Sequence, residues 1–283
     1  DVCSSDLSST ATVVVTVNTL PNVTAVASPS TICQNSSTTL TANGATTYSW
    51  SPSTGLSSTV GTTVTATPNT TTTYTVTGTA GTNCVSTGTV VVTVNQLPTV
   101  TVNTVTICAG SSATLTAGGA TTYNWSPSTG LSATTGASVT ASPNTTTTYT
   151  VTGTVTATGC LNTATSTVTV HQLPVVNAGP NISLCNQPIP DTLLGYTPSG
   201  GTWSGSGVTA AGIFTPSALG SFVLTYTYTN NFGCVNHDTM TVTVINPQIA
   251  NAGTGFSICI SAATTNLPAA TPSGGTWTGT GVV

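Results

Sequence analysis

Histidine, aspartate and cysteine are the reactive side chains in this sequence. The 283 residues include two histidines, four acidic residues and eight cysteines. His237 and Asp238 are neighbours, but adjacent side chains on a strand point to opposite faces, so we expect no catalytic or metal site there. His171 precedes Gln172-Leu173-Pro174 and is predicted to be a junction or surface residue.

Other kinds of reaction centre have no support in the sequence. Hydrolysis by paired carboxylates would need Asp191 and Asp238 to converge, and no pattern brings them together. Calcium sites need several acidic oxygens, which the junctions between the predicted repeats lack. The cysteines do not have the CxxC spacing of zinc or redox motifs. We therefore predict that the protein is not an enzyme and has no cofactor and no metal.

The charge composition limits the partners of the chain. It has no lysine or arginine and a formal net charge of −4 at pH 7. A chain without cations cannot neutralise phosphates, which excludes nucleic acid and argues against anionic membrane surfaces. Membrane insertion is not expected either, because no apolar run approaches the roughly 18 residues of a membrane-spanning segment.

A repeat of about 75 residues organises the chain. The phrase Gly-Ala-Thr-Thr-Tyr-x-Trp-Ser-Pro-Ser-Thr-Gly-Leu-Ser begins at Gly44 and again at Gly119. A second type of repeat carries Gly-Gly-Thr-Trp, ending at Trp203 and again at Trp277. Arrays of this kind commonly supply length, surface and spacing. The positions that recur in the first type are Tyr48 and Tyr123, Trp50 and Trp125, Tyr74 and Tyr149, and Cys33 and Cys108.

The repeats predict five segments. Residues 1–21 combine adaptor-like residues, which resemble a translated sequencing adaptor, with the last strand of a truncated repeat. Residues 22–98 and 99–174 are Ig-like repeats of the first type, each closing on Gln-Leu-Pro. Residues 175–247 are a repeat of the second type, and residues 248–283 are a truncated copy of it. Short junctions that contain proline favour a semi-rigid rod.

Alternation of threonine with apolar residues predicts β-strands. Thr73-Tyr74-Thr75-Val76-Thr77 has the period of a half-buried strand and the β-branched residues that strands favour. About seven short strands per repeat, with a tryptophan on the third, predict an all-β fold of tandem immunoglobulin-like β-sandwich domains of about 75 residues in a semi-rigid rod. The expected core of the first domain is Leu40, Trp50, Val64, Tyr74, Val76 and Val92.

The motifs of the repeats also resemble a known kind of sequence. The pattern Ile-Cys-x-x-x-Ser…Thr-Leu-Thr-Ala…Tyr-x-Trp-Ser…Thr-Tyr-Thr-Val-Thr-Gly…Cys, from Ile32 to Cys84, resembles the Ig-like and PKD-like repeats of large secreted surface proteins in Bacteroidota. Such repeats occur in adhesins and in gliding-associated proteins that carry type IX secretion sorting domains. The resemblance implies a secreted array of Ig-like domains.

The cysteines recur at fixed places, which indicates an oxidising compartment and disulfides. An immunoglobulin disulfide joins the middles of the second and sixth strands, which run parallel. Cys33 lies well before the middle of the second strand, and Cys84 lies well after the middle of the sixth strand. The two cysteines are therefore expected at opposite ends of the domain. This favours inter-domain disulfides Cys33–Cys160 and Cys108–Cys234, with pairing inside a domain as the alternative.

Two acidic residues precede candidate modification sites. Asp191-Thr192-Leu193 and Asp238-Thr239-Met240 resemble the O-glycosylation motif of Bacteroidota secreted proteins, which implies glycans on Thr192 and Thr239. Chance occurrence in a threonine-rich chain is the alternative.

These features predict a structural segment of an adhesin or fibre, extracellular or on the cell surface, that provides length and an assembly surface. Its partners would be neighbouring repeats or like chains in a filament. One alternative is a carbohydrate-binding surface module, which needs exposed aromatic residues outside the core. Another is an ice- or mineral-binding array of threonine rows such as residues 71–77, which needs a flat face that a twisted sandwich supplies poorly.

Overall fold

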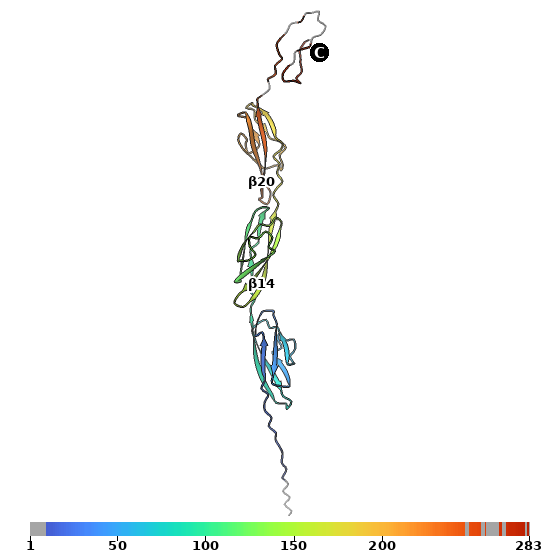
Figure 1. Cartoon of the computed structure of the whole chain (residues 1–283), viewed down its shortest axis with the longest axis vertical. Coiled ribbons are helices and arrows are strands. Elements are labelled where there is room, and N and C mark those ends of the chain that lie inside the picture. The colour runs from blue at the N-terminus through green and yellow to red at the C-terminus, as the bar shows by residue number, and fades with distance from the viewer. Residues whose placement is uncertain are drawn as a thin grey trace, which may run out of the picture. The chain divides into compact units, whose positions relative to one another are not determined.

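The computed structural model describes residues 10–246, 249–255, 258, 266–267, 270–280 and 282. The chain divides into two compact units, Asp1–Val170 and His171–Val283. The adaptor-like residues, Cys3 and Cys259 lie outside the described residues. The described part consists of strands, turns and irregular segments without any helix (Figure 1), so the fold is all-β.

The first sandwich of unit 1 has seven strands: β1 (Thr24–Ser28), β2 (Thr31–Cys33), β3 (Thr38–Asn43), β4 (Thr47–Ser51), β5 (Thr63–Ala66), β6 (Thr72–Thr79) and β7 (Val85–Asn95). One sheet has the order β1-β3-β5 and the other the order β2-β7-β6-β4. The neighbours are antiparallel except β2 and β7, which are parallel. This strand order is that of an immunoglobulin-like sandwich.

The second sandwich of unit 1 repeats this arrangement. Its strands are β8 (Thr101–Val102), β9 (Val105–Cys108), β10 (Ala113–Gly118), β11 (Thr122–Ser126), β12 (Ser138–Ala141), β13 (Thr147–Val155) and β14 (Cys160–His171). The sheet orders are β12-β10-β8 and β11-β13-β14-β9, which match those of the first sandwich strand for strand.

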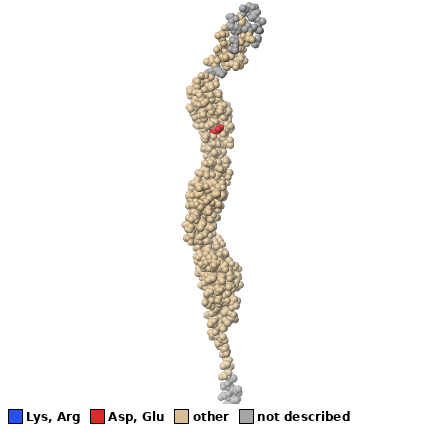
Figure 2. Space-filling view, in the orientation of Figure 1, with Lys and Arg blue, Asp and Glu red and all other residues tan. Residues whose placement is uncertain are grey.

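Side-chain alternation builds both layers of each sandwich. On β6, Tyr74 and Val76 are buried between the sheets, while Thr73 is exposed on the outer face. Because successive side chains on a strand point to opposite faces, threonine and serine cover the outside of the sheets. Figure 2 shows the result as a surface with one red patch and no blue, in agreement with a sequence that has no lysine or arginine.

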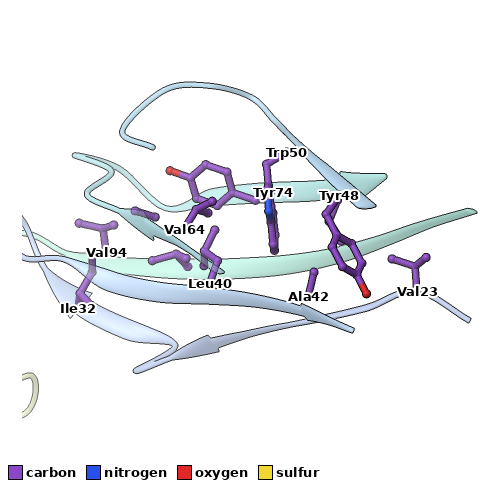
Figure 3. Packing of buried hydrophobic residues seen from close by; sticks show 12 residues of the cluster. Val23, Ile32, Leu40, Ala42, Tyr48, Trp50, Val64, Tyr74 and Val94 are labelled. Carbon is purple, nitrogen blue, oxygen red and sulfur yellow. The ribbon is translucent and has the colours of Figure 1, made fainter. Parts of the chain in front are cut away.

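The core predicted for the first sandwich is confirmed. Figure 3 shows Trp50, Tyr74 and Leu40 between the two sheets. Burying side chains of this size contributes about 1.5–3 kcal/mol each. The indole N–H of Trp50 donates to the carbonyl of Gly61 at 2.9 Å, so its polar atom is satisfied. The six predicted residues and their exposed fractions are Leu40 0%, Trp50 3%, Val64 3%, Tyr74 0%, Val76 0% and Val92 0%.

The repeated phrase Gly-Ala-Thr-Thr-Tyr forms a self-closing turn. The hydroxyl of Tyr48 accepts from the backbone N–H of Ala45 at 2.7 Å and donates to the carbonyl of the same residue at 2.8 Å. Gly44 has a φ of +96°, and a Cβ there would lie 1.8 Å from the carbonyl oxygen of Asn22. The turn therefore requires glycine for both conformation and space. Tyr123 closes the equivalent turn of the second repeat.

Unit 2 contains a sandwich of the second type. Its strands are β15 (Ile182–Cys185), β16 (Asp191–Thr192), β17 (Thr202–Ser204), β18 (Ile213–Phe214), β19 (Gly220–Thr229) and β20 (Val235–Ile245). The sheets have the orders β15-β20-β19-β17 and β16-β18, and β15 is parallel to β20 as β2 is to β7. The rings of Trp203 and Tyr226 pack with their centroids 5.0 Å apart in the buried core.

The structure differs from the sequence prediction at two strands. Strand β2 is not predicted by the alternation pattern, because three residues are too few to show a period. Conversely, the last strand expected within residues 8–21 does not form in the described part, where the backbone from 10 to 23 is irregular. Val14 and Val17 are 87% and 89% exposed. A strand needs a neighbour for its hydrogen bonds, and none of the described strands pairs with this segment.

The segment boundaries set out from the repeats remain predictions. Residues 247–248 and much of the predicted truncated copy at 248–283 lie outside the described residues. Asn251 and Thr271 form a bridge there, and Trp277 is 38% exposed.

Candidate functional site

The candidate catalytic residues lie apart within unit 2. His237 is exposed and Asp238 half-buried at successive positions of β20, as the alternation predicted. Asp191 lies on β16, in the other sheet, so strands of different sheets carry the two carboxylates. His171 ends β14, and its ring stacks on Phe232 with centroids 3.8 Å apart.

Asp238 has a structural partner. Its Oδ2 accepts from the backbone N–H of Ala178 at 2.9 Å and so holds the segment that precedes β15 against β20. The backbone N–H groups of Ala178 and Thr239 hold the pKa of Asp238 below its ordinary value of 3.8. A carboxylate stabilised in its charged form is a poor general acid at neutral pH.

The described residues do not form a metal site or another kind of reactive site. They contain no cluster of three or more His, Cys, Asp or Glu residues suited to a metal ion. They also contain no helix long and apolar enough to cross a membrane. A shallow hollow on the first sandwich is lined by threonine, serine, Val60 and Tyr48, whose hydroxyl is already bonded to Ala45. Burial raises the pKa of Tyr74 and of Tyr149, which makes neither a base at neutral pH.

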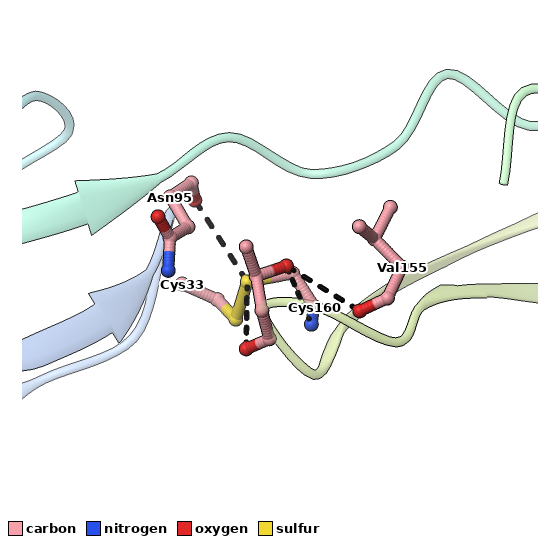
Figure 4. Close-up of a disulfide and its surroundings, with 5 residues drawn as sticks. Cys33, Asn95, Val155 and Cys160 are labelled. Carbon is pink, nitrogen blue, oxygen red and sulfur yellow. Dashed lines mark hydrogen bonds between the residues drawn. A yellow bond between two sulfur atoms is a disulfide. The ribbon is translucent and has the colours of Figure 1, made fainter. Parts of the chain in front are cut away.

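The feature that the structure assembles is a junction between repeats. Cys33 and Cys160 form a disulfide with their Cα atoms 5.6 Å apart (Figure 4). Cys33 is the last residue of β2, where it lies across from Asn95 at the end of β7. Cys160 opens β14, the last strand of the second sandwich. The bond therefore joins the closing end of one sandwich to the turn before the last strand of the next.

Backbone carbonyls of the connecting segment line the junction. The Sγ of Cys160 lies 4.0 Å from the carbonyl oxygen of Asn95. Two positions along β14, the side-chain amide of Asn162 donates to the carbonyl of Pro98 at 3.1 Å. These contacts seat the turn of the second sandwich on residues 95–98. The disulfide is thus one part of a larger contact with hydrogen bonds of its own.

Within unit 2, the segment that precedes the sandwich makes the same two kinds of contact, one with a cysteine sulfur and one with an asparagine amide. The Sγ of Cys234 lies 3.9 Å from the carbonyl oxygen of His171, and the amide of Asn236 donates to Pro174 at 2.8 Å. Cys234 and Cys108 are each disulfide-bonded. The stack of His171 on Phe232 is an addition that the sequence analysis missed, and an aromatic residue two positions before Cys234 was the available signal.

Outer faces of the four-stranded sheets carry rows of hydroxyl groups. In the first sandwich, strand register aligns Ser51, Thr75 and Thr89 in one row across β4, β6 and β7. In the second sandwich, the hydroxyl groups of Thr148 and Thr167 lie 2.9 Å apart across β13 and β14. These rows present donors and acceptors without charge, so they hydrate the surface but do not repel a neighbour.

The two glycosylation candidates are accessible. Thr239 is exposed on the outer face of β20, across from Thr225. Thr192 is exposed on β16, across from Ile213. Each threonine therefore presents its side chain to solvent, which modification requires. Since Asp238 already holds Ala178, a structural role accounts for the acidic residue before Thr239 without invoking a glycan.

Comparisons with known proteins show distant likeness in fold. No family model and no curated protein matches the sequence. A Ca2+-stabilized adhesin with which an Antarctic bacterium binds ice is 16% identical, with 83% of this chain and 77% of that chain covered and a TM-score of 0.39. A titin I-band fragment is 12% identical, covering 80% and 96%, with a TM-score of 0.36. The eight N-terminal Ig domains of Down syndrome cell adhesion molecule are 11% identical, covering 79% and 35%, with a TM-score of 0.31.

Proposed function

We propose that this chain is a structural segment of an adhesin or fibre, extracellular or on the cell surface, which provides length and an assembly surface. The observation that carries the proposal is the disulfide between Cys33 and Cys160, because it ties together two sandwiches that each have a core of their own. A bond in this place holds one repeat to the next. Disulfides persist in oxidising compartments, which supports a location outside the cytoplasm.

The surface supports assembly as the second part of this role. Hydroxyl rows cover the sheet faces, and the sequence has no cation. Net charge is what usually keeps protein surfaces apart in solution. A nearly uncharged surface favours contact with neighbouring repeats or with like chains in a filament, and glycans are the alternative cover.

Electron microscopy of native material tests the proposal. An antibody raised against this chain, applied to intact cells and to shed material, is expected to label extracellular filaments or stalks. The same antibody absorbed with the purified chain is the control. Label confined to the cell interior would contradict the proposed role.

Ice or mineral binding is a second candidate, favoured by the aligned row Ser51, Thr75 and Thr89. Against it, sheets twist, and Val91 lies across from Thr73 in the neighbouring row. Partition of the purified chain into slowly growing ice distinguishes the two functions. We expect exclusion of the chain. Retention that is lost in a Thr75→Lys variant would favour the second candidate.

Carbohydrate binding is less well supported by the described residues. Stacking on a sugar needs exposed aromatic rings. Phe232 is 65% exposed, but its ring is stacked on His171. Tyr48, Trp50 and Tyr74 are 9%, 3% and 0% exposed. These three rings form the core of the first sandwich.

A further inference from the structure

The side-chain amide of Asn162 uses both of its polar atoms at the junction. Its Nδ2 group donates to the carbonyl of Pro98 in the connecting segment at 3.1 Å. Its Oδ1 atom accepts from the backbone N–H of Thr163 at 2.9 Å, which fixes the orientation of the amide. Asn162 is half-buried and lies two positions after Cys160 on β14. A charged aspartate has the same shape but no donor for a carbonyl, so this arrangement requires an amide.

Unit 2 repeats the arrangement with a second asparagine. Asn236 lies two positions after Cys234. Its Nδ2 group donates to the carbonyl of Pro174 at 2.8 Å, and its Oδ1 atom accepts from the backbone N–H of His237 at 3.0 Å. The same spacing and the same two hydrogen bonds thus occur in two types of repeat whose other motifs differ. The asparagine is therefore associated with the cysteine and not with one type of repeat.

The other half of the disulfide is held by backbone hydrogen bonds of its own. At one end of β2, the N–H of Thr93 donates to the carbonyl of Ser30 at 2.9 Å. At the other end, the N–H of Gln34 donates to the carbonyl of Asn95 at 2.8 Å. These bonds keep Cys33, the last residue of β2, across from Asn95. Cys33 therefore keeps its place without help from the bond between the sulfur atoms.

A short stretch of chain connects the anchors of the two cysteines. Asn95 and Pro98 are three positions apart in sequence, so an extended chain between their Cα atoms spans about 10 Å at most. The bond at Asn95 positions Cys33, and the bond between Pro98 and Asn162 positions Cys160. The two cysteine Cα atoms lie 5.6 Å apart, within the range that a disulfide requires. Hydrogen bonds that do not involve sulfur therefore bring the two cysteines together.

We propose that Asn162 is a positioning residue that selects Cys33 as the disulfide partner of Cys160. The chain has eight cysteines, and pairing without guidance would distribute Cys160 among the others. A hydrogen bond between Asn162 and Pro98 in the reduced chain holds the two thiols together and raises their effective concentration for each other.

The oxidation itself needs only a disulfide of the form R–S–S–R. The thiols of Cys33 and Cys160 lose two protons and two electrons as the new bond forms, and the oxidant becomes two R–SH. The inference goes beyond the proposed function, because it concerns how the junction forms and is tested on the purified chain. Either one can fail while the other stands.

The effective concentration of the two thiols tests this role of Asn162. The full chain retains Cys33 and Cys160 and carries serine in place of every other cysteine. The purified protein is equilibrated with reduced and oxidised glutathione at a series of ratios, and the bonded fraction is measured. We expect Asn162→Ala to lower the effective concentration about three- to tenfold through the lost hydrogen bond. Asn162→Asp should lower it about tenfold or more, because a carboxylate then faces the carbonyl of Pro98.

Asn124→Asp is the matched control for the added charge. Asn124 is exposed on β11 of the same sandwich, and no hydrogen bond of its side chain holds the junction. This variant should retain the effective concentration of the unaltered pair. A decrease equal to that of Asn162→Asp would assign the effect to net charge and overturn the inference.

Competition among all eight cysteines tests the selection of the partner. The reduced chain refolds in glutathione buffer, and peptide mapping without reductant gives the yield of the Cys33–Cys160 bond. We expect this bond to dominate in the unaltered chain. In Asn162→Asp, Cys160 should be distributed among several partners. Asn236→Asp, which removes the equivalent bond from unit 2, should leave the yield of Cys33–Cys160 unchanged.

Amide hydrogen exchange separates positioning from general support of the fold. Retained protection of β10 and β13 together with a lowered effective concentration supports the positioning role. Lost protection of these strands in both Asn162 variants would show that the residue supports the second sandwich as a whole, and the inference would fail. An unchanged effective concentration in both variants would also overturn it.

Discussion

Single residues in this protein have tasks that their neighbours do not share. The hydroxyl of Tyr48 closes a turn that Gly44 makes sterically possible. The Oδ2 of Asp238 accepts a hydrogen bond from the backbone N–H of Ala178. Both tasks satisfy backbone groups outside the regular sheets, where an unpaired N–H or carbonyl is costly. The role of Asp238 is the easier of the two to test, because the charge of its carboxylate depends on pH.

We expect Asp238→Asn to weaken unit 2 at neutral pH and to reduce its acid sensitivity. The folded pKa of Asp238 is lowered by the N–H groups of Ala178 and Thr239, so its stabilising effect is present above the unfolded pKa and disappears as pH falls through the folded one, below 3.8. The difference between wild type and variant should therefore shrink in acid. Hydrogen exchange of β19 and β20 peptides across this pH range measures it.

Asp191→Asn is the matched control for this prediction. It removes one carboxylate from the other sheet of the same unit and leaves the bond to Ala178 intact. Equal pH dependence in the two variants would show that Asp238 acts only through net charge.

Among the elements, the short strand β2 positions one half of the disulfide. Its parallel pairing with β7 places Cys33 across from Asn95, at the closing end of the first sandwich. Strand β14 places Cys160 at the start of the next sandwich's last strand. Strands of two different repeats thus meet at the disulfide, whereas the cores of the two sandwiches do not include it.

Pulling single molecules from their ends should detect this disulfide, because it shortens the length of the fully unfolded chain. With the disulfide intact, the segment between Cys33 and Cys160, separated by 127 residues in sequence, cannot extend. Cys108 and Cys234 are also disulfide-bonded, so the measurement uses a chain that carries Cys108→Ser and Cys234→Ser. In this background, a reductant or the substitution Cys33→Ser should lengthen the fully unfolded chain by about 430 Å, at about 3.4 Å per residue. The force that unfolds each sandwich should change little, because the bond lies outside both cores.

Cys84→Ser serves as the control in this experiment, since that residue is free in the described chain. It should leave the extended length unchanged without reductant. An identical length for the background chain, the same chain under reductant and its Cys33→Ser variant would refute the connection between the sandwiches.

The whole molecule presents a surface with almost no charge. Asp191 and Asp238 are the only acidic residues in the described part, and the sequence has no basic residue other than two histidines. Edge strands are usually protected from pairing with other chains by charged side chains. This protein lacks that protection, so we infer that a glycan cover or assembly into a filament keeps its edges occupied.

We expect native protein to carry glycans on Thr192 and Thr239, which are exposed and follow acidic residues. A glycosylated segment should weigh more than 27.9 kDa, and peptide mass spectrometry should place the extra mass on these residues. Bare recombinant chain should self-associate at concentrations where native chain does not, and Thr192→Ala with Thr239→Ala should make native chain behave like recombinant chain.

Two results would lead to different conclusions about the cover. Unmodified native chains that remain dispersed as single molecules would disprove the need for one. Unmodified native chains packed side by side in a filament would instead assign the protection of the edges to assembly.

Local patterns in the sequence were sufficient for most strands of the first sandwich and for their buried faces. Alternation with period two placed Trp50, Tyr74 and Val76 in the core, because side-chain direction along a strand depends only on the backbone. The repeat of the pattern predicted that residues 99–174 would fold like residues 22–98, and the two sheet orders agree strand for strand. The immunoglobulin-like topology followed from the number of strands and the position of the tryptophan.

The contacts between distant segments required the three-dimensional structure. Strand β2 exists because β7 offers it a parallel edge, and residues 10–23 stay irregular because no described strand offers them one. The sequence favoured Cys33–Cys160 over a pair within one domain, but the distance between two cysteines far apart in the chain is set by how the sheets and turns pack, and the folded chain brings these Cα atoms to 5.6 Å. The partners of the Asp238 carboxylate and the Tyr48 hydroxyl are likewise backbone groups, which have no sequence signature.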